Sequence, residues 1–141
     1  MLKTITPFPN GYFVYGLISR LTAKHSTLVA TERTGGELEG LPRVFTGALL
    51  SPKGHSTWIV VNDAPRAWNG EFRLAGLGGA KLYEYQVSSA VRDQPTLKIQ
   101  PLRVPRLPSE PGNFHDSLPA MSLTVLSTFK LGANERGVIA E

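Results

Sequence analysis

Acidic side chains are the first candidates for chemistry, because acid–base hydrolysis needs two carboxyl groups facing each other about 5 to 10 Å apart. The acidic residues between positions 63 and 116 fall singly, at expected turns or on expected solvent faces: Asp63, Glu71, Glu84, Asp93, Glu110 and Asp116. We therefore expect no catalytic residue, no paired carboxylates and no enzymatic activity. Asp63 is the one acidic residue for which we expect more than a solvent-exposed position. Asn62-Asp63 before Ala64-Pro65 is typical of a turn in which a side-chain oxygen caps backbone amides, which is a structural role.

The histidines, serines and glycines also lack the spacing of a reaction centre. His25, His55 and His115 have no metal-ligand spacing, so we expect no metal site. No Gly-x-Ser-x-Gly turn occurs. The segment Gly76-Leu77-Gly78-Gly79 precedes an expected strand rather than a helix, which favours a hairpin turn over a phosphate loop. The chain has no cysteine, which excludes disulfides, and no motif predicts a cofactor.

Exposed aromatic side chains would indicate sugar binding, because sugars stack their C–H faces on Trp and Tyr rings while polar side chains bind their hydroxyl groups. Trp68 is the best candidate, since it lies in a polar, turn-like segment with Arg66 and Asn69 as donors. Tyr83 and Tyr85 share one face of an expected strand. They could form a platform, but packing under a helix is the favoured interpretation. Trp68, Asn69, Arg66, Tyr83 and Tyr85 are thus the tentative carbohydrate-binding residues.

Two other aromatic residues are expected to be structural. Trp58 precedes the β-branched run Ile59-Val60-Val61, and large rings there favour a sandwich core. Phe114 lies in a proline-rich stretch, where we expect it to anchor a loop or, if exposed, to mark an interface.

The elements that must position these residues are mostly short strands. Each expected strand is bounded by Gly, Pro, Asn or Ser: Thr27 to Glu32, Arg43 to Leu50, Thr57 to Asn62, Glu71 to Ala75, Lys81 to Ala90, Leu97 to Val104 and Ser122 to Phe129. In the segment from Leu118 to Leu126, which contains the start of the last strand, apolar and hydroxyl residues alternate. We therefore expect one face of this strand in the core and one in water. The pattern predicts an all-β fold, an antiparallel β-sandwich of about seven to eight strands.

One helix is expected, from Gly11 to Lys24, because apolar residues recur there at spacings of three and four. Pro9-Asn10 supplies a break and an N-cap before it. We expect its Tyr15 and Ile18 side to lie on the sheet.

Turn residues set the expected connections. Gly35-Gly36, Pro52-Lys53-Gly54, Asn69-Gly70 and Gly78-Gly79 each fall between expected strands and predict reversals. The prolines from Pro101 to Pro119 predict an edge strand followed by a long surface crossover. We therefore divide the chain into an N-terminal extension (1–10), a single β-sandwich domain with its N-terminal helix (11–131) and a flexible tail (132–141).

Composition limits the partners that we expect. The 141 residues suffice for one domain, and 14 Gly with 11 Pro argue against a helical bundle. The net charge of +4 comes from scattered residues rather than a basic stripe, so we expect no nucleic-acid partner. No apolar run is long enough for a membrane span, and the segment from Met1 to Pro7 does not read as a signal peptide, so the compartment stays unknown.

Four segments together resemble the C-terminal part of certain retaining glycoside hydrolases, which include arabinofuranosidases, xylosidases and glucuronidases. They are Tyr12 to Leu21, Trp58 to Asp63, Leu82 to Val87 and Leu118 to Leu126. In those enzymes a (β/α)8 catalytic barrel is followed by a β-sandwich. The resemblance covers residues 11 to 130 and implies an accessory β-sandwich domain without the barrel that carries the catalytic carboxylates.

Two hypotheses follow. The first is a non-catalytic module that packs on a glycosidase catalytic barrel, in cis or in trans, and exposes an apolar patch around its helix when alone. The second is a free-standing carbohydrate-binding module that recognises plant polysaccharide through exposed aromatic residues. An apolar patch left uncovered also predicts a homo-oligomer.

Overall fold

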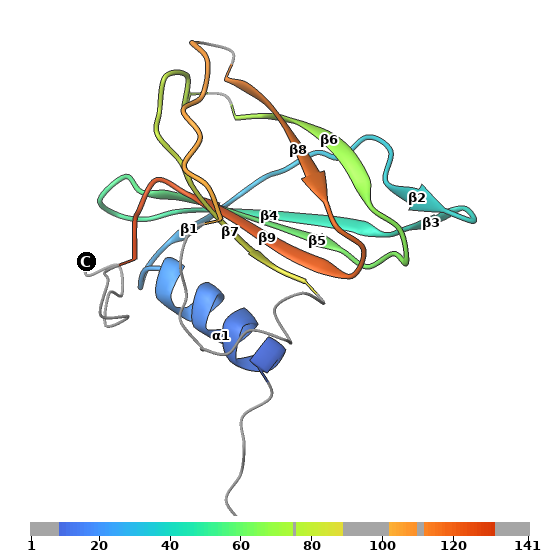
Figure 1. The fold of residues 1–141 in the computed structure, drawn as a ribbon. Coiled ribbons are helices and arrows are strands. Elements are labelled where there is room, and N and C mark those ends of the chain that lie inside the picture. Colours follow the sequence, from blue (N-terminus) through green and yellow to red (C-terminus); the bar gives the residue numbers. More distant parts are fainter. Residues whose placement is uncertain (1–8, 75, 89–101, 110–111, 132–141) are drawn as a thin grey trace, which may run out of the picture.

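The computed structural model describes residues 9–74, 76–88, 102–109 and 112–131. These residues form one helix and a set of short antiparallel strands (Figure 1). The elements are α1 (Pro9–Leu21), β1 (Thr27–Val29), β2 (Glu37–Leu38), β3 (Leu41–Pro42), β4 (Val44–Leu50), β5 (Ser56–Asn62), β6 (Trp68–Arg73), β7 (Tyr83–Val87), β8 (Asn113–Leu118) and β9 (Ser122–Ser127). The expected all-β class with a single helix is confirmed. The tail from 132 to 141 and the first eight residues lie outside the described residues.

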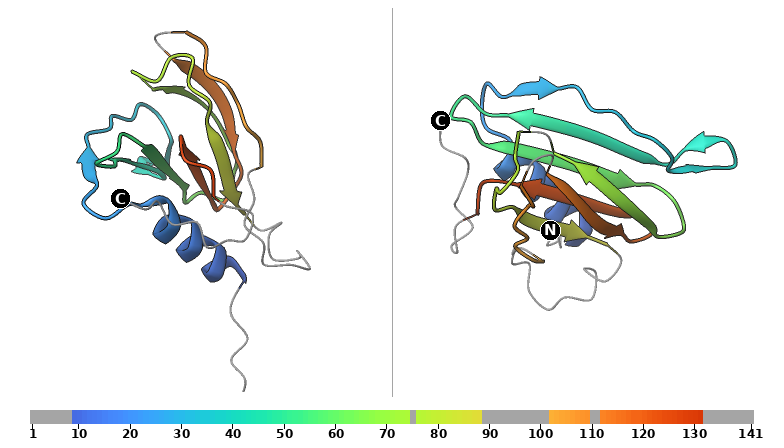
Figure 2. Two further views of the ribbon diagram at one scale, coloured as in Figure 1. Left: turned by 90° about the vertical axis from the view of Figure 1, so that its left-hand side faces the viewer. Right: turned by 90° about the horizontal axis from the view of Figure 1, so that it is seen from above.

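The strands form a layered sandwich. A five-stranded antiparallel sheet has the order β1-β4-β5-β9-β7, and β6 pairs with β8 in a separate two-stranded ribbon. The ribbon lies over one face of the large sheet and α1 lies on the opposite face (Figure 2). A third, small pair, β2 with β3, extends beyond the sheet. The core is therefore divided, with one cluster under α1 and two between the sheet and the ribbon.

The closing strand β9 is buried on both faces, so the expectation of a water-facing side was wrong. Leu123 and Val125 pack toward α1, whereas Leu126 packs toward the ribbon. Its hydroxyl residues are buried as well, because neighbours satisfy them: Thr124 Oγ1 accepts a hydrogen bond from Gln86 at 3.1 Å. Alternation alone does not distinguish a water-facing side from a second core with polar partners.

The proline-rich stretch also differs from expectation. Single bridges pair Arg103 with Glu84 and Arg106 with Lys81, so this part does lie along the edge of β7. The following segment is not a surface crossover, however, because Asn113–Leu118 forms β8 and buries Phe114 in the core. No proline interrupts the chain between Gly112 and Leu118, which leaves every backbone donor of β8 available. Residues 97–101 of the expected strand from Leu97 to Val104 lie outside the described residues.

Asn69-Gly70 does not form the expected turn, because both residues lie within β6. The reversal comes earlier, at Asn62, whose side chain is 1% exposed. The Asn62 amide nitrogen lies 2.9, 3.2 and 2.8 Å from the carbonyl oxygens of Arg66, Leu118 and Pro119, and its Oδ1 accepts the Ala64 N–H. The capping role expected of Asp63 thus belongs to Asn62.

The helix α1 presents a different face from the expected one. Leu17 and Leu21, four residues apart, are each 1% exposed and pack on β7 and β9. Tyr15 is 77% exposed and Ile18 is 38% exposed. The apolar residues of this helix form two overlapping stripes, and spacing alone does not indicate which stripe meets the sheet.

Candidate functional site

Arg66 and Trp68 are the two predicted sugar-binding residues that the fold brings together. The Arg66 guanidinium carbon lies 4.5 Å from the centroid of the Trp68 ring, the geometry of a cation–π contact. Trp68 is half-buried and packs against the cluster of Val44, Val60 and Leu118. Because core residues and Arg66 both contact the ring, a sugar would have to displace Arg66 to stack on it.

The other predicted residues lie elsewhere. Asn69 follows Trp68 on β6 and is exposed on the opposite, outer face of the ribbon. Tyr83 is half-buried on the helix side of β7, below α1, with Lys81 Nζ 5.7 Å from its ring. Tyr85 is 1% exposed, and its hydroxyl accepts the Leu131 N–H at 3.1 Å. Tyr85 therefore has no free ring face, so its assignment to a sugar platform was wrong, whereas its packing under the helix is confirmed.

Two acidic residues expected to stand alone are brought together. Glu84 on β7 is 0% exposed and Asp116 on β8 has a side chain 7% exposed. Arg103 joins them: its Nε donates to Glu84 Oε2, and its Nη2 donates to Asp116 Oδ1 at 2.6 Å. The two carboxyl groups are therefore bound to neighbouring nitrogens of one guanidinium. The expectation that these acids fall singly on solvent faces was therefore wrong, and the described part does hold a carboxyl pair. Asp93 and Glu110 lie outside the described residues.

The electrostatics of Glu84 follow from this burial. Loss of water raises the pKa of the Glu84 carboxyl from 4.5 to about 7, and the neighbouring Asp116 adds to the increase while Arg103 opposes it. Arg103 is itself held in place from a second side, since its guanidinium lies 5.1 Å from the Phe114 ring. The burial of Glu84 could be predicted from the sequence, because the period of two in a strand places Glu84 on the same face as Leu82, which is buried. No spacing connects Glu84 with Asp116, which is distant in the chain.

The helix side of the large sheet carries an uncovered apolar surface. We call it the helix-side face and define it by Ile18, Leu28 and Phe45, which are exposed, together with Val61, which is half-buried opposite Phe45. The register places Leu28 opposite Leu49, and Phe45 opposite Val61, on this side of the sheet. Because α1 packs mainly on β7 and β9, no described element covers β1 and β4 here. Leu28 is 75% exposed and Phe45 is 49% exposed.

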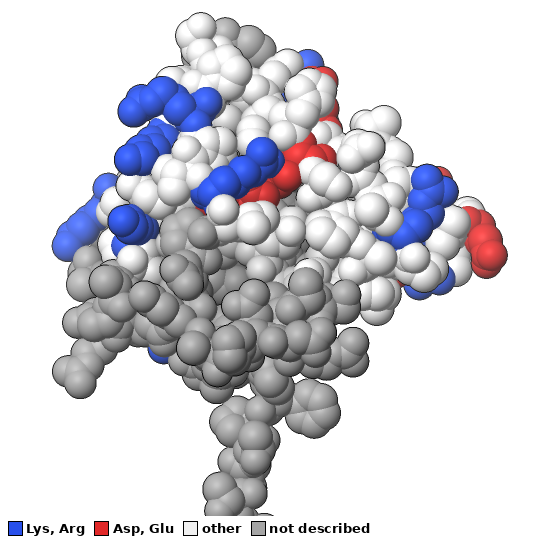
Figure 3. All heavy atoms as spheres, in the orientation of Figure 1, with Lys and Arg blue, Asp and Glu red and all other residues white. Residues whose placement is uncertain are grey.

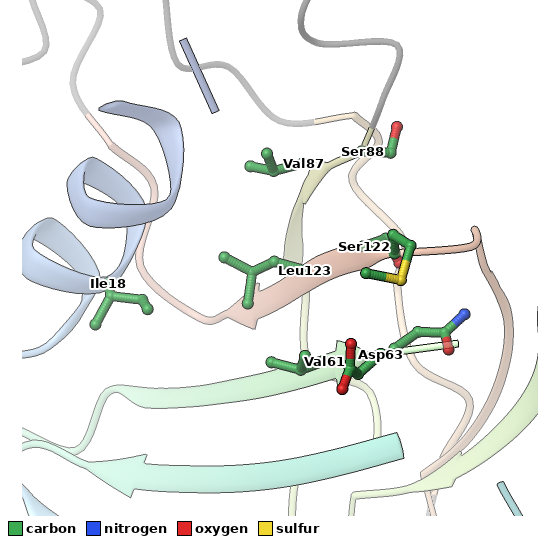
Figure 4. A pocket seen from close by; sticks show the side chains of 9 residues that line it. Ile18, Val61, Asp63, Val87, Ser88, Ser122 and Leu123 are labelled. Carbon is green, nitrogen blue, oxygen red and sulfur yellow. The ribbon is translucent and has the colours of Figure 1, made fainter. Parts of the chain in front are cut away.

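A pocket of about 310 Å³ lies between α1 and the ends of β5, β7 and β9 (Figure 4). The side chains of Ile18, Val61, Val87 and Leu123 point toward a shared space. Asn62, Asp63, Ser88, Met121 and Ser122 complete the lining. Met121 is 60% exposed. The pocket is thus continuous with the helix-side face through Ile18 and Val61, and it offers an apolar floor with a polar rim.

His55 and His115 each have a side-chain neighbour. The His55 ring packs edge-on against Phe129 with centroids 5.3 Å apart, and His115 Nε2 lies 3.6 Å from Glu71 Oε2. Among the described residues, no three His, Asp or Glu side chains converge to hold a metal ion. In the same part of the chain, no helix is long and apolar enough to cross a membrane.

Comparison with known proteins gives a likeness in structure alone. No protein-family model matches the sequence, and no curated protein matches it. A xylanase of glycoside hydrolase family 30, subfamily 8, from Clostridium acetobutylicum superposes with a TM-score of 0.64 at 17% identity, over 86% of this chain and 28% of the xylanase. At that identity the likeness shows the fold.

Two further glycoside hydrolases overlap less. A family 51 arabinofuranosidase from Xanthomonas axonopodis pv. citri has a TM-score of 0.45 and 20% identity, over 68% of this chain and 20% of its own. A family 44 xyloglucanase from Paenibacillus polymyxa has a TM-score of 0.48 and 11% identity, over 60% of this chain and 16% of the xyloglucanase. TM-scores below 0.5 do not establish a shared fold. The structural neighbours are glycoside hydrolases, as the sequence resemblance predicted, and this chain spans less than a third of the length of each.

Proposed function

We propose that this chain is a non-catalytic β-sandwich accessory module of a glycoside hydrolase, which packs through its helix-side face on the catalytic barrel of that enzyme. The partial match to a larger xylanase supports the class of enzyme. The role of the module and the identity of its partner are inferred from the chemistry of its surface.

The observation that carries this proposal is the uncovered half of the sheet beside α1. Sheets bury their apolar face against a second layer, because exposed apolar area is unfavourable in water. Here α1 supplies that layer for β7 and β9, while Phe45 and Leu28 stay largely exposed. An exposed apolar sheet surface of this kind is typical of a docking site for another domain.

The carboxyl pair supports a role without catalysis. Glycoside hydrolysis uses carboxyl groups separated by about 5 to 9.5 Å on either side of a substrate. Glu84 and Asp116 are both bound to Arg103, and Glu84 is fully buried, so a sugar has no access to the Glu84 carboxyl group. Their contacts are those of a structural ion pair bridged by Arg103.

The proposal can be tested with the coding sequence on either side of this chain. We expect it to encode a (β/α)8 glycosidase domain, which is then produced together with this chain, as one polypeptide or as two. The chain should raise the thermal unfolding temperature of the barrel, and Phe45→Asp should abolish this effect. Leu41→Asp is the matched control, because Leu41 is 57% exposed in the β2–β3 pair, away from the helix-side face.

Two results would contradict the proposal. One is the absence of a barrel on either side, or a barrel whose stability is the same with and without the chain. The other is release of sugar from xylan or arabinan by the isolated chain, abolished by Glu84→Gln, which would show that the buried pair is catalytic. A free-standing carbohydrate-binding module remains the alternative, and it depends on Trp68.

A further inference from the structure

Three elements meet at the buried carboxyl pair: β7 through Glu84, β8 through Asp116, and the segment 102–109 through Arg103. Main-chain hydrogen bonds hold that segment to β7. The Glu84 N–H donates to the Arg103 oxygen at 3.0 Å, and the Leu102 N–H donates to the Glu84 oxygen at 2.6 Å. The carboxyl pair therefore lies where the large sheet, the ribbon and this segment are joined.

In each of the two carboxyl groups, one oxygen accepts hydrogen bonds and the other has no donor among the described residues. Glu84 Oε2 and Asp116 Oδ1 accept from Arg103, and Asp116 Oδ1 also accepts the Ser117 N–H at 2.7 Å. Glu84 Oε1 and Asp116 Oδ2 are buried and have no donor among the described residues. Both are acceptors when ionised, and a buried acceptor without a donor is costly.

The charges of the three side chains also favour one proton on the carboxyl pair. Two ionised carboxylates beside one guanidinium leave a net negative charge in a buried place, and such a charge is normally removed by protonation. The face in Figure 3 shows acidic and basic side chains in contact near its centre. The other charged groups nearby are engaged elsewhere: Arg106 donates to the Gly79 oxygen, Lys81 lies over Tyr83, and His115 faces Glu71. Opposite Glu84 on β9 is Leu126, which is apolar.

We propose that Glu84 and Asp116 share one proton, carried on Glu84 Oε1 and donated to Asp116 Oδ2, and that this proton fastens the segment 102–109 and the ribbon to β7. Loss of the proton leaves two negative groups on one Arg103 and loosens the junction. We call this protonated carboxyl pair, with Arg103, the clasp, because it holds the three elements together. It is independent of the proposed docking function.

The direction of the pH effect follows from the raised pKa of Glu84. Between pH 4.5 and about pH 7, the Glu84 carboxyl of the folded chain retains a proton that the unfolded chain has released. This contribution to stability is complete below pH 4.5 and is lost as the pH rises through about 7. Glu84→Gln keeps the shape and the donor of the protonated acid without the titration. Its unfolding temperature should match wild type near pH 5 and exceed it at pH 8.5.

Three measurements test the clasp. Carbon-13 NMR titration of the wild-type side chains should show Glu84 titrating near neutral pH. Thermal unfolding from pH 5 to 8.5 should show a fall in wild type that Glu84→Gln reduces and that the matched control Glu39→Gln, at an exposed residue between β2 and β3, leaves unchanged. Amide hydrogen exchange at Leu102 and Glu84 should accelerate above pH 7 beyond the rise at Val60, in the centre of the sheet.

The proposal is overturned if the Glu84 carboxyl titrates near its ordinary value, or if Glu84→Gln keeps the wild-type pH dependence of unfolding. The NMR titration uses wild type alone, so it decides the matter even if a variant fails to fold. Equal exchange at Leu102 and Val60 across the pH range would reject the loosening of the segment.

Discussion

At the scale of single residues, the buried polar groups determine where the chain is most sensitive to substitution. The Asn62 side chain joins the end of β5 to the reversal before β6 and to the β8–β9 turn. One amide thus holds a local reversal, at Arg66, and two carbonyl groups that are distant in sequence, at Leu118 and Pro119. Its neighbour Asp63 is exposed and has one distant cation, Arg43, at 3.9 Å.

Asn62→Ala is expected to lower the free energy of unfolding by about 2 to 4 kcal/mol, because the carbonyl oxygens of Arg66, Leu118 and Pro119, which are buried or partly buried, lose a donor. Chemical denaturation measures this change. Asp63→Ala is the control and should change stability by less than about 0.5 kcal/mol, since exposed side chains contribute little. Equal effects of the two variants would contradict the assignment of the stabilising role to Asn62.

Trp68→Ala distinguishes the packing role of this ring from sugar binding. We expect a loss of about 2 kcal/mol in unfolding free energy, because the ring packs on Val44, Val60 and Leu118 but is half-buried. Binding to plant cell-wall polysaccharides, measured by depletion from solution, should be absent in both wild type and variant. Asn69→Ala is the matched exposed control. Wild-type binding that Trp68→Ala removes, with stability unchanged, would instead support the carbohydrate-binding module.

At the scale of elements, the orientation of α1 decides which of its apolar residues matter. Leu17→Ala should cost about 2 to 4 kcal/mol, since Leu17 is 1% exposed under the helix. Tyr15→Ala should stay within about 0.5 kcal/mol, because Tyr15 is 77% exposed and packs on nothing in the core. Thermal or denaturant unfolding of both variants measures the difference. The reverse order would mean that the helix packs by its Tyr15 and Ile18 side.

Local patterns predicted the elements whose environment is local. The runs that became β4, β5, β7 and β9 were recognisable because β-branched and aromatic residues alternate between turn residues. Trp58 was correctly assigned to packing, since it packs against the cluster below the ribbon. Phe114 was expected to anchor a loop, and it lies instead in strand β8 with its ring in that cluster. The strand β8 was missed because its flanking prolines indicated a crossover, while its pairing with β6 depends on residues far away in sequence.

The candidate site was less predictable for the same reason. Glu84 and Asp116 have ordinary neighbours in sequence, and the fold alone brings them to Arg103. Trp68 and Asn69 were grouped because they are adjacent, yet the strand places them on opposite faces of β6. Adjacency predicts a shared site in a turn, and it predicts opposite faces in a strand.

At the scale of the whole molecule, the two faces of the large sheet are covered unequally. The ribbon β6–β8 packs on one face through two clusters, whereas α1 protects part of the other. The exposed apolar residues Phe45, Leu28 and Ile18 gather on the face that α1 leaves open. A partner domain would complete the second layer, and in its absence a second copy of the chain offers the same apolar chemistry.

The isolated chain is therefore expected to self-associate through the helix-side face. Light scattering at increasing concentration should show a mass above that of the monomer. Phe45→Asp should weaken association at least about tenfold, or about 1.4 kcal/mol, because a charge would be buried at the centre of the contact. Leu41→Asp should leave association unchanged, since Leu41 lies in the β2–β3 pair. A monomer mass at every concentration would mean that the helix-side face is too small to hold two copies together, and that its docking depends on the larger, complementary surface of a catalytic domain.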